Sequence, residues 1–318
     1  MFENPVFLLF AGLLLLLTGG EFLVRGGVSL AANYKISTLV IGVTVVSLGT
    51  SAPELVVSAE AALSGHPDIA MGNVLGSNIA NIGLVLGLTI LITPVFTDTG
   101  KLLFNMLVML AVTLLLYALI ADRLLTRPEG FILVFLLVAF VWYSIRRSRI
   151  SLRNGVGEIP EKRHSLIISV LIILVSCLAL VAGARFLVDG ASELARNIGV
   201  SERAISVSVI ALGTSLPELA TSAIAAFRKQ SDISIGNIIG SNIFNILGIL
   251  GTSSMIRPVG ISPGILNFDM LWCLGIALIL FAAMLPLRRI LLGRIKGLAL
   301  IVIYVLYIYL VFSRDSLL

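Results

Sequence analysis

Two short stretches of nearly the same sequence place a carboxylate in strongly apolar surroundings. The stretches are "LGTSAPEL" at 48–55 and "LGTSLPEL" at 212–219, and each carries one glutamate, Glu54 or Glu218. An ionised acid in the middle of a membrane helix costs about 2.5–3.5 kcal/mol on insertion scales, so it indicates a functional site by default. No Lys or Arg stands at a matching depth to pair with these acids. We therefore expect them to bind a cation from solution; a structural ion pair or a protonated acid is the alternative.

Each stretch also predicts a break in its own helix. Pro53 and Pro217 lack an N–H and therefore free the carbonyl four residues earlier, at Gly49 and Gly213. Glycine at that position makes local unwinding easier. Free backbone inside a bilayer is tolerated only where protein or a wet cavity surrounds it. Hydroxyl groups add further oxygen ligands at the same level: Thr50, Ser51, Thr214 and Ser215.

A second pair of stretches predicts a polar stripe on a neighbouring helix. These are "GNVLGSNIANI" at 72–82 and "GNIIGSNIFNI" at 236–246. Polar side chains recur in them at i, i+4 and i+8, which is one face of a helix. The residues are Asn73, Ser77 and Asn81 in the first stretch and Asn237, Ser241 and Asn245 in the second. We expect this stripe to face the broken segments, with the adjacent glycines allowing a close approach of another helix. These glycines are Gly72, Gly76, Gly236 and Gly240.

The predicted ligands are all oxygen atoms, since both histidines, His66 and His164, lie in expected loops. Oxygen-only coordination suits Ca²⁺, Na⁺ or Mg²⁺ rather than Zn²⁺ or Cu²⁺. Two ionised carboxylates neutralise one Ca²⁺, and the many neutral oxygens suit the six to eight ligands of Ca²⁺ better than compact octahedral Mg²⁺.

Other functional classes fit the sequence less well. It contains no H-E-x-x-H zinc motif and no serine beside a base, so we expect neither an enzyme nor a cofactor other than the transported ions. Duplicated oxygen-rich segments could line a passive cation channel. One site built from two inverted halves suits alternation better than a continuous pore.

The composition requires a membrane protein. The chain has 318 residues, of which 58% are hydrophobic and 12% are charged, against roughly 25% charged in soluble domains. Continuous apolar runs of about 20 residues indicate an all-α fold with ten transmembrane helices, and their lack of alternation excludes a β-barrel. The expected spans are 5–33, 37–64, 69–92, 102–121, 128–145, 165–195, 203–227, 232–256, 266–286 and 295–313. We interpret the first run as a retained helix and not as a signal peptide.

The chain contains an internal repeat. Residues 44–87 align without gaps to residues 208–251, with 24 identities among 44 pairs that include Pro, Glu, Asn and Ser. Five helices per half mean that the second half runs inverted relative to the first, as in many secondary transporters. The expected organisation is a first five-helix repeat at 1–145, a cytoplasmic linker at 146–164 and a second, inverted repeat at 165–318.

Basic residues in the loops predict the orientation. An external N-terminus puts fourteen Lys and Arg on the cytoplasmic side against six outside, which agrees with the positive-inside rule. The net charge of +5 therefore reflects membrane topology and does not indicate nucleic-acid binding. Glu21 and Arg25 are expected to form a structural i, i+4 ion pair, as are Arg185 and Asp189.

The paired motifs resemble the two α-repeats of the cation/Ca²⁺ antiporter superfamily, and within it the prokaryotic sodium/calcium exchangers. The resemblance covers essentially the whole chain. It implies a cluster of ion sites at mid-membrane and a gate, formed by the first and sixth helices, that slides across the other eight. Glu54 and Glu218 would be the central Ca²⁺ ligands, and Asn81 and Asn245 would border the centre. Further ligands implied by the resemblance are backbone oxygens of Thr50 and Thr214, and, at flanking Na⁺ sites, Ser51, Ser77, Ser215 and Ser241 with the carbonyls of Ser47 and Ala211.

One departure from related patterns bears on the coupling ion. Some relatives, including potassium-dependent exchangers, have Asp where Asn245 stands, and proton-coupled exchangers usually show "GN-x-x-E" where this chain has "GNVLG" and "GNIIG". We therefore predict a K⁺-independent antiporter that exchanges Ca²⁺ for Na⁺ by alternating access. The alternative is an H⁺-coupled antiporter of Ca²⁺ or another divalent cation. The expected partners are these ions and the lipid of a cell membrane, which a monomer crosses several times with its middle loop in the cytoplasm.

Overall fold

The computed structural model describes residues 4–155, 160, 163–198, 213–285 and 289–315, and most of these residues are helical. They form two compact units, each of which takes residues from both sequence halves. The first unit consists of Met1–Pro53 with Ile145–Asn237, and the second of Glu54–Ser144 with Ile238–Leu318.

The helices have the lengths and composition of membrane spans, as predicted. Within the described residues, eight helices are long and apolar enough to cross a bilayer, and one further span consists of Thr38–Thr50 and Ala52–Ser64, bent by 50°. The predicted span at 203–227 is described only from residue 213, where it contains the short apolar helix Leu216–Phe227. This arrangement is consistent with ten transmembrane helices in two inverted repeats.

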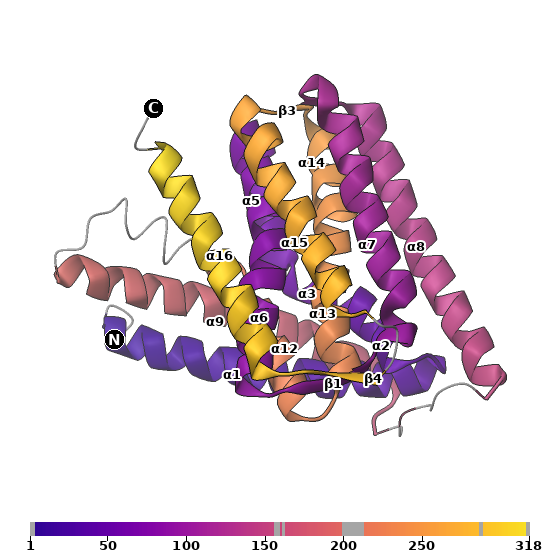
Figure 1. The fold of residues 1–318 in the computed structure, drawn as a ribbon. Coiled ribbons are helices and arrows are strands. Elements are labelled where there is room, and N and C mark those ends of the chain that lie inside the picture. Colours follow the sequence, from indigo (N-terminus) through magenta and orange to yellow (C-terminus); the bar gives the residue numbers. More distant parts are fainter. Residues whose placement is uncertain (1–3, 156–159, 161–162, 199–212, 286–288, 316–318) are drawn as a thin grey trace. The chain divides into compact units, whose positions relative to one another are not determined.

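The first unit is built around two long helices, α1 and α9, which lie side by side in Figure 1. Its elements are α1 (Pro5–Tyr34), α2 (Thr38–Ile41), the π-helix η1 (Gly42–Val46), α3 (Ser47–Thr50), α9 (Leu166–Asn197) and α12 (Leu216–Phe227). Glycines at seven-residue spacing on α1, namely Gly12, Gly19 and Gly26, face α9. A Cβ on Gly12 would lie 2.7 Å from the backbone nitrogen of Leu187 and 2.8 Å from the carbonyl oxygen of Gly183. The two helices therefore pack backbone against backbone, as small residues permit in membranes.

Polar contacts tie the end of the predicted linker to this helix pair. The carbonyl oxygen of His164 accepts hydrogen bonds from the Ser29 hydroxyl, at 3.2 Å, and from Asn33 Nδ2, at 3.0 Å. The start of the linker is helical, since α8 (Arg127–Arg153) continues eight residues beyond the predicted span. No Gly or Pro interrupts the sequence between the apolar run and Gly155, which adopts φ 74°, so helix propensity continues after hydropathy ends.

The second unit is a bundle of shorter helices with two small antiparallel ribbons (Figure 1). Its elements are α5 (Pro67–Ala80), the π-helix η2 (Asn81–Leu86), α6 (Gly87–Ile92), β1 (Val95–Asp98), α7 (Thr99–Leu119), η3 (Ile120–Asp122), β2 (Leu124–Leu125), the π-helix η5 (Asn245–Leu250), α14 (Gly251–Ile256), β3 (Val259–Gly260), the π-helix η6 (Ile265–Asp269), α15 (Met270–Ala283), β4 (Arg289–Leu292) and α16 (Arg294–Asp315). Strand β1 pairs with β4 and β2 with β3. Helices α4 (Ala52–Ser64), α8 and α13 (Ser231–Phe244) contribute residues to both units.

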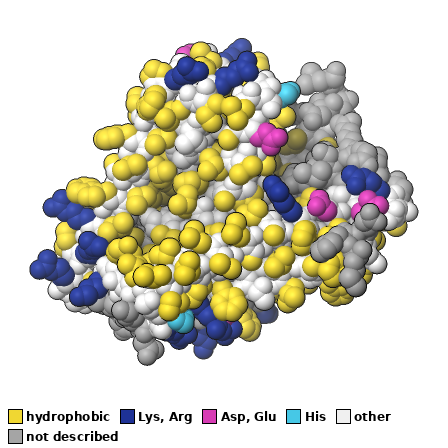
Figure 2. Space-filling view, turned by 180° about the vertical axis from the view of Figure 1, so that it is seen from behind, with side chains coloured by type: hydrophobic (Ala, Val, Ile, Leu, Met, Phe, Trp, Pro, Cys, Tyr) yellow, Lys and Arg dark blue, Asp and Glu magenta, His cyan; other side chains and the backbone are white. Residues whose placement is uncertain are grey.

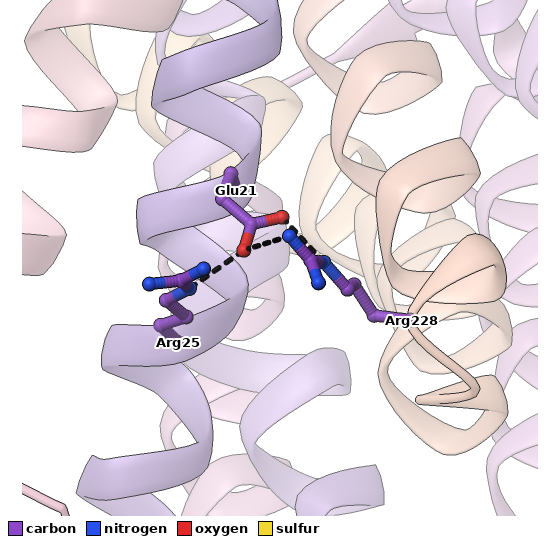
Figure 3. A network of polar contacts seen from close by, with 3 residues as sticks. All are labelled: Glu21, Arg25 and Arg228. Carbon is purple, nitrogen blue, oxygen red and sulfur yellow. Dashed lines mark hydrogen bonds and ion pairs between the residues drawn. The ribbon is translucent and has the colours of Figure 1, made fainter.

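Glu21 on α1 forms the ion pair predicted from the sequence and one that was not predicted. Its carboxylate lies 2.6 Å from Arg25 Nε and 2.8 Å from Arg228 Nη2 (Figure 3). Arg228 is the residue directly after α12. This acid is therefore held by two arginines and connects α1 to the end of α12. The expected pair of Arg185 with Asp189 is wrong, because it does not occur among the ion pairs of the described residues.

The described surface is largely apolar. Figure 2 shows hydrophobic side chains over most of one face, with Lys and Arg side chains mainly in small groups near its edges. Large side chains such as Phe10 and Ile167 are 71% and 73% exposed, which suits contact with lipid and not with water. Cys177 on α9 and Cys273 on α15 are free thiols, and unpaired cysteine in such surroundings behaves as a small hydrophobic residue.

Candidate functional site

The first motif forms a break between two helices. Helix α3 ends at Thr50, Ser51 adopts φ −83° and ψ 12°, and α4 begins at Ala52. Pro53 is the second residue of α4, where a missing N–H leaves no helical hydrogen bond unmade. Glu54 follows it and is 0% exposed, as are Thr50 and Ser51. The chain thus turns at the hydroxyl residues and directs the glutamate into the protein.

The second motif repeats this arrangement within the described residues. Thr214 and Ser215 form a turn, and α12 then begins at Leu216 with Pro217 in its first turn. Glu218 is 0% exposed, and Ser215 is 3% exposed. Ala211, one of the predicted carbonyl ligands, lies outside the described residues.

A hydrogen bond joins the two motifs inside the first unit. The Ser51 hydroxyl donates to Glu218 Oε1 over 2.9 Å. Ser51 comes from the first repeat and Glu218 from the second, and both side chains are fully buried. The structure therefore brings together a hydroxyl and a carboxylate that the sequence separates by 167 positions.

A second chain of hydrogen bonds positions Thr50. Its hydroxyl donates to Asn237 Oδ1 at 3.1 Å, and Asn237 Nδ2 donates in turn to the Ser222 hydroxyl at 3.0 Å. The hydroxyl of Thr50 also lies 3.3 Å from the carbonyl oxygen of Ser47, which accepts the backbone N–H of Ser51 at 3.0 Å. The Ser47 carbonyl thus accepts from the backbone N–H of Ser51, and it shares the single hydroxyl proton of Thr50 with Asn237.

The equivalent asparagine of the first repeat makes an equivalent contact in the second unit. Asn73 Nδ2 donates to the Ser58 hydroxyl at 2.8 Å and to the carbonyl oxygen of Glu54 at 3.2 Å. The predicted stripe therefore faces the broken helix at Asn73, as it does at Asn237. Sequence reasoning missed Ser58 and Ser222, although the repeat alignment matches them as identical residues.

The remaining stripe residues are buried, and both repeats change helix type at the same point. Ser77 is 5% exposed, while Asn81, Ser241 and Asn245 are 0% exposed. The π-helices η2 and η5 begin at Asn81 and Asn245 respectively. Single π turns often mark functional sites, because the extra residue in the turn redirects the side chains around it. No sequence signal predicted these turns.

Asn78 is a further polar residue that sequence reasoning did not single out. Its Nδ2 donates to the carbonyl oxygen of Asn242 at 3.2 Å, and its Oδ1 accepts from Asn245 Nδ2 at 3.0 Å. All three residues belong to the second unit, and none is more than 2% exposed. The identity of Asn78 and Asn242 as the last residue of both "GSN" motifs was the available signal.

The motif glycines contact helix α9 closely. A Cβ on Gly49 would lie 2.5 Å from Cys177 Sγ, and one on Gly213 would meet the side chain of Val188. Glycine is therefore needed here for packing, in addition to any ease of unwinding. Among the stripe glycines, Gly236 faces a close neighbour as predicted, since a Cβ on it would lie 3.0 Å from the Leu39 carbonyl oxygen.

The expected close approach stays a prediction for the first repeat, because the repeat matches the segment that lies against Gly236 to residues 203–206, which are outside the described residues. A Cβ on Gly72 or on Gly76 would meet no described atom within 4 Å.

Comparisons with known proteins agree on one family. The sequence profile of the sodium/calcium exchanger protein family matches residues 4–146 and 168–313. The putative antiporter CaxA of Alkalimonas amylolytica is 39% identical over 322 residues, covering 98% of this chain and 100% of that protein. The sodium/calcium exchanger MaX1 of Methanosarcina acetivorans is 36% identical over 116 residues, which is 36% of this chain and 33% of that protein.

The fold gives the same result. The solved structure of the sodium–calcium exchanger NCX_Mj, soaked with zero Na⁺ and Ca²⁺, matches with a TM-score of 0.83 and 30% sequence identity. The match covers 98% of this chain and 100% of that one. With its duplicated acidic motifs, its broken span and its all-helical membrane architecture, the chain belongs to the sodium/calcium exchanger family of cation antiporters.

Proposed function

We propose that this antiporter exchanges Ca²⁺ for Na⁺ by alternating access, without K⁺, and that Glu54 and Glu218 supply the carboxylates that bind Ca²⁺. The observation that carries the proposal is the full burial of two glutamates at equivalent positions of two repeats. Inside a membrane protein such acids are costly unless an ion or a hydrogen bond balances them. The hydrogen bond from Ser51 to Glu218 supports a shared role for the two motifs.

The oxygen atoms around the glutamates favour hard cations. We assign the backbone oxygens of Thr50 and Thr214 to Ca²⁺ and the amides of Asn81 and Asn245 to the border of its site. Flanking Na⁺ sites would use Ser51, Ser77, Ser215 and Ser241 with the carbonyls of Ser47 and Ala211. Ser215 supports this assignment, because its buried hydroxyl has no hydrogen-bond partner among the described residues.

Competition for charge explains exchange. Two carboxylates balance one Ca²⁺, but they cannot also offset the desolvation of several Na⁺ ions. Occupancy by one kind of ion therefore excludes the other. Neutral Asn245 keeps the number of acids at two, and this supports transport without K⁺.

The mobile element of the exchanger would be the pair α1 and α9. Their glycine-mediated backbone contacts favour movement as one body. The basic loops favour an external N-terminus and a cytoplasmic middle loop. An asymmetric accessibility assay with cysteines introduced into the 146–164 linker tests this orientation.

Transport assays on the purified full-length protein in liposomes test the function. Vesicles loaded with Na⁺ should take up Ca²⁺ when the outside is free of Na⁺, and vesicles loaded with K⁺ at equal pH should not. If an outward H⁺ gradient alone drives Ca²⁺ uptake, the coupling ion is H⁺ and the Na⁺ part of the proposal is refuted. Uptake in the absence of any opposing cation gradient would indicate a channel and overturn the proposal.

A further inference from the structure

We propose that Asn78 is a positioning residue that fixes the amide of Asn245 with its carbonyl oxygen available to the transported cation. This inference rests on the proposed function, because it assumes that Asn245 borders the ion site. Asn78 itself is not proposed as a ligand: it acts through Asn245.

The orientation of both amides follows from a single backbone atom. The carbonyl oxygen of Asn242 can only accept, so the group of Asn78 that lies 3.2 Å from it must be Nδ2. The other end of the Asn78 amide is then Oδ1, which can also only accept. Asn245 must therefore present Nδ2 to it, over 3.0 Å. The Asn242 carbonyl thus fixes the orientation of the Asn78 amide, and Asn78 in turn fixes which end of the Asn245 amide faces it.

The consequence is a buried acceptor at the opposite end of the Asn245 amide. Among the described residues, Asn245 Oδ1 has no hydrogen-bond partner, and the residue is 0% exposed. A buried acceptor without a donor is destabilising, whereas an amide oxygen is a good ligand for Na⁺ and Ca²⁺. Asn245 also begins the π-helix η5, whose wider turn sets its direction. A cation next to Oδ1 would complete the coordination that the protein leaves open.

The repeat supplies an internal comparison, since Asn242 and Asn81 stand where Asn78 and Asn245 stand in the other half. Asn242 Nδ2 donates to the Ile238 carbonyl at 2.8 Å, and its Oδ1 has no partner among the described residues. Neither end of the Asn81 amide has such a partner. Of these two pairs, only Asn78 and Asn245 are joined by a hydrogen bond within the described part of the chain, and the Asn242 side chain offers a matched control.

Without Asn78, the Asn245 amide can rotate about its terminal bond and present NH₂ groups to the cation. Removing a partner that orients a metal ligand typically weakens affinity by about 10–100-fold. An aspartate at position 245 needs no such orientation, because its two carboxylate oxygens are equivalent. The effect of losing Asn78 should therefore depend on whether residue 245 is an asparagine or an aspartate.

The test is a double-mutant cycle on Ca²⁺ binding, measured by titration calorimetry with Ca²⁺ alone on the purified full-length protein. Asn78→Ala should raise the Ca²⁺ dissociation constant by about tenfold or more, and this loss should largely disappear in the Asn245→Asp background. Asn242→Ala should have the same effect in both backgrounds, because the Asn242 side chain makes no hydrogen bond to Asn245. Thermal unfolding of Asn78→Ala at a temperature close to that of Asn242→Ala would separate positioning from folding.

The outcomes separate this inference from the function on which it rests. Equal losses for Asn78→Ala with asparagine or aspartate at position 245 would overturn the positioning role. If Glu54→Gln and Glu218→Gln in addition abolish Ca²⁺ binding, the proposed function stands and only the role of Asn78 is refuted. Wild-type binding in both glutamine variants would refute the ion site itself.

Discussion

The hydroxyl of Ser51 donates a hydrogen bond of 2.9 Å to Oε1 of Glu218, which links the broken helix of one repeat to the acid of the other. Hydrogen bonds to a charged acceptor are stronger than those between neutral groups, and burial strengthens them further. The geometry of Glu218 thus depends on a residue from the other half of the chain. A change at one motif should therefore affect ion binding at the other.

Neutralising either repeated glutamate should abolish Ca²⁺ transport. Glu54→Gln and Glu218→Gln keep nearly the same side-chain shape but remove the charge that offsets the desolvation of Ca²⁺. Uptake of radioactive Ca²⁺ into Na⁺-loaded proteoliposomes measures the effect.

Glu21→Gln provides the control for these variants. Glu21 is held by Arg25 and Arg228, so we regard it as structural, and its loss should leave Ca²⁺ uptake present. Wild-type flux in Glu54→Gln or in Glu218→Gln would remove that residue from the ion site.

Truncating Ser51 should weaken ion binding without unfolding the protein. Ser51 holds the Glu218 carboxylate by a hydrogen bond, and removing a partner that orients a metal ligand typically weakens affinity by about 10–100-fold, so Ser51→Ala should raise the Ca²⁺ dissociation constant by about tenfold or more. Calorimetric titration of the purified protein measures it. Ser253→Ala is the matched control, because Ser253 is equally buried but its hydroxyl has no partner among the described residues. Equal affinities for the two variants would contradict the role of this bond.

Gly49→Ala should lower the thermal stability and the Ca²⁺ uptake of the protein, because the new side chain would clash with Cys177. The added methyl group would lie 2.5 Å from Cys177 Sγ, and overpacking of this kind typically destabilises by about 1–3 kcal/mol. Cys177→Ala should rescue the variant, since the nearest remaining atom is the Cβ of residue 177 at 3.9 Å.

Thermal unfolding and Ca²⁺ uptake measure both effects of Gly49→Ala. Gly72→Ala is the control, because its methyl group would meet no described atom within 4 Å. If Gly49→Ala is as stable and as active as Gly72→Ala, then α9 does not pack closely against the broken helix at Gly49. Failure of Cys177→Ala to rescue would show that another contact is responsible.

Gly12→Ala should separate α1 from α9 and lower the thermal stability. Its methyl group would meet backbone atoms of Leu187 and Gly183, which no rotamer change can move away, so a loss of about 1–3 kcal/mol is expected. The melting temperature of the purified protein measures this loss. Gly275→Ala on α15 serves as the reference, because its added methyl group would meet no described atom within 4 Å. Identical melting temperatures would refute the backbone-to-backbone packing of the pair.

The sequence by itself determined the class of this protein and the location of its candidate site. Long apolar runs require membrane helices, a repeat that matches Pro, Glu, Asn and Ser indicates duplication, and five spans per half make the second copy inverted. The positions of the helix breaks could also be predicted, because a proline removes a hydrogen bond regardless of what surrounds it. These properties are local or periodic, so they can be recognised without knowing which segments meet.

Only the tertiary structure decided which polar atoms are paired. Both repeats have asparagine at the two matched positions, 78 and 242, and 81 and 245. Asn78 nevertheless forms a hydrogen bond with Asn245, whereas Asn81 and Asn242 lack the equivalent hydrogen bond within the described residues. The π turns at Asn81 and Asn245 and the close approach of Cys177 to Gly49 also had no sequence signature. The physical reason is that each of these features depends on which distant segment lies against the residue, and identical motifs in a repeated sequence do not specify that neighbour.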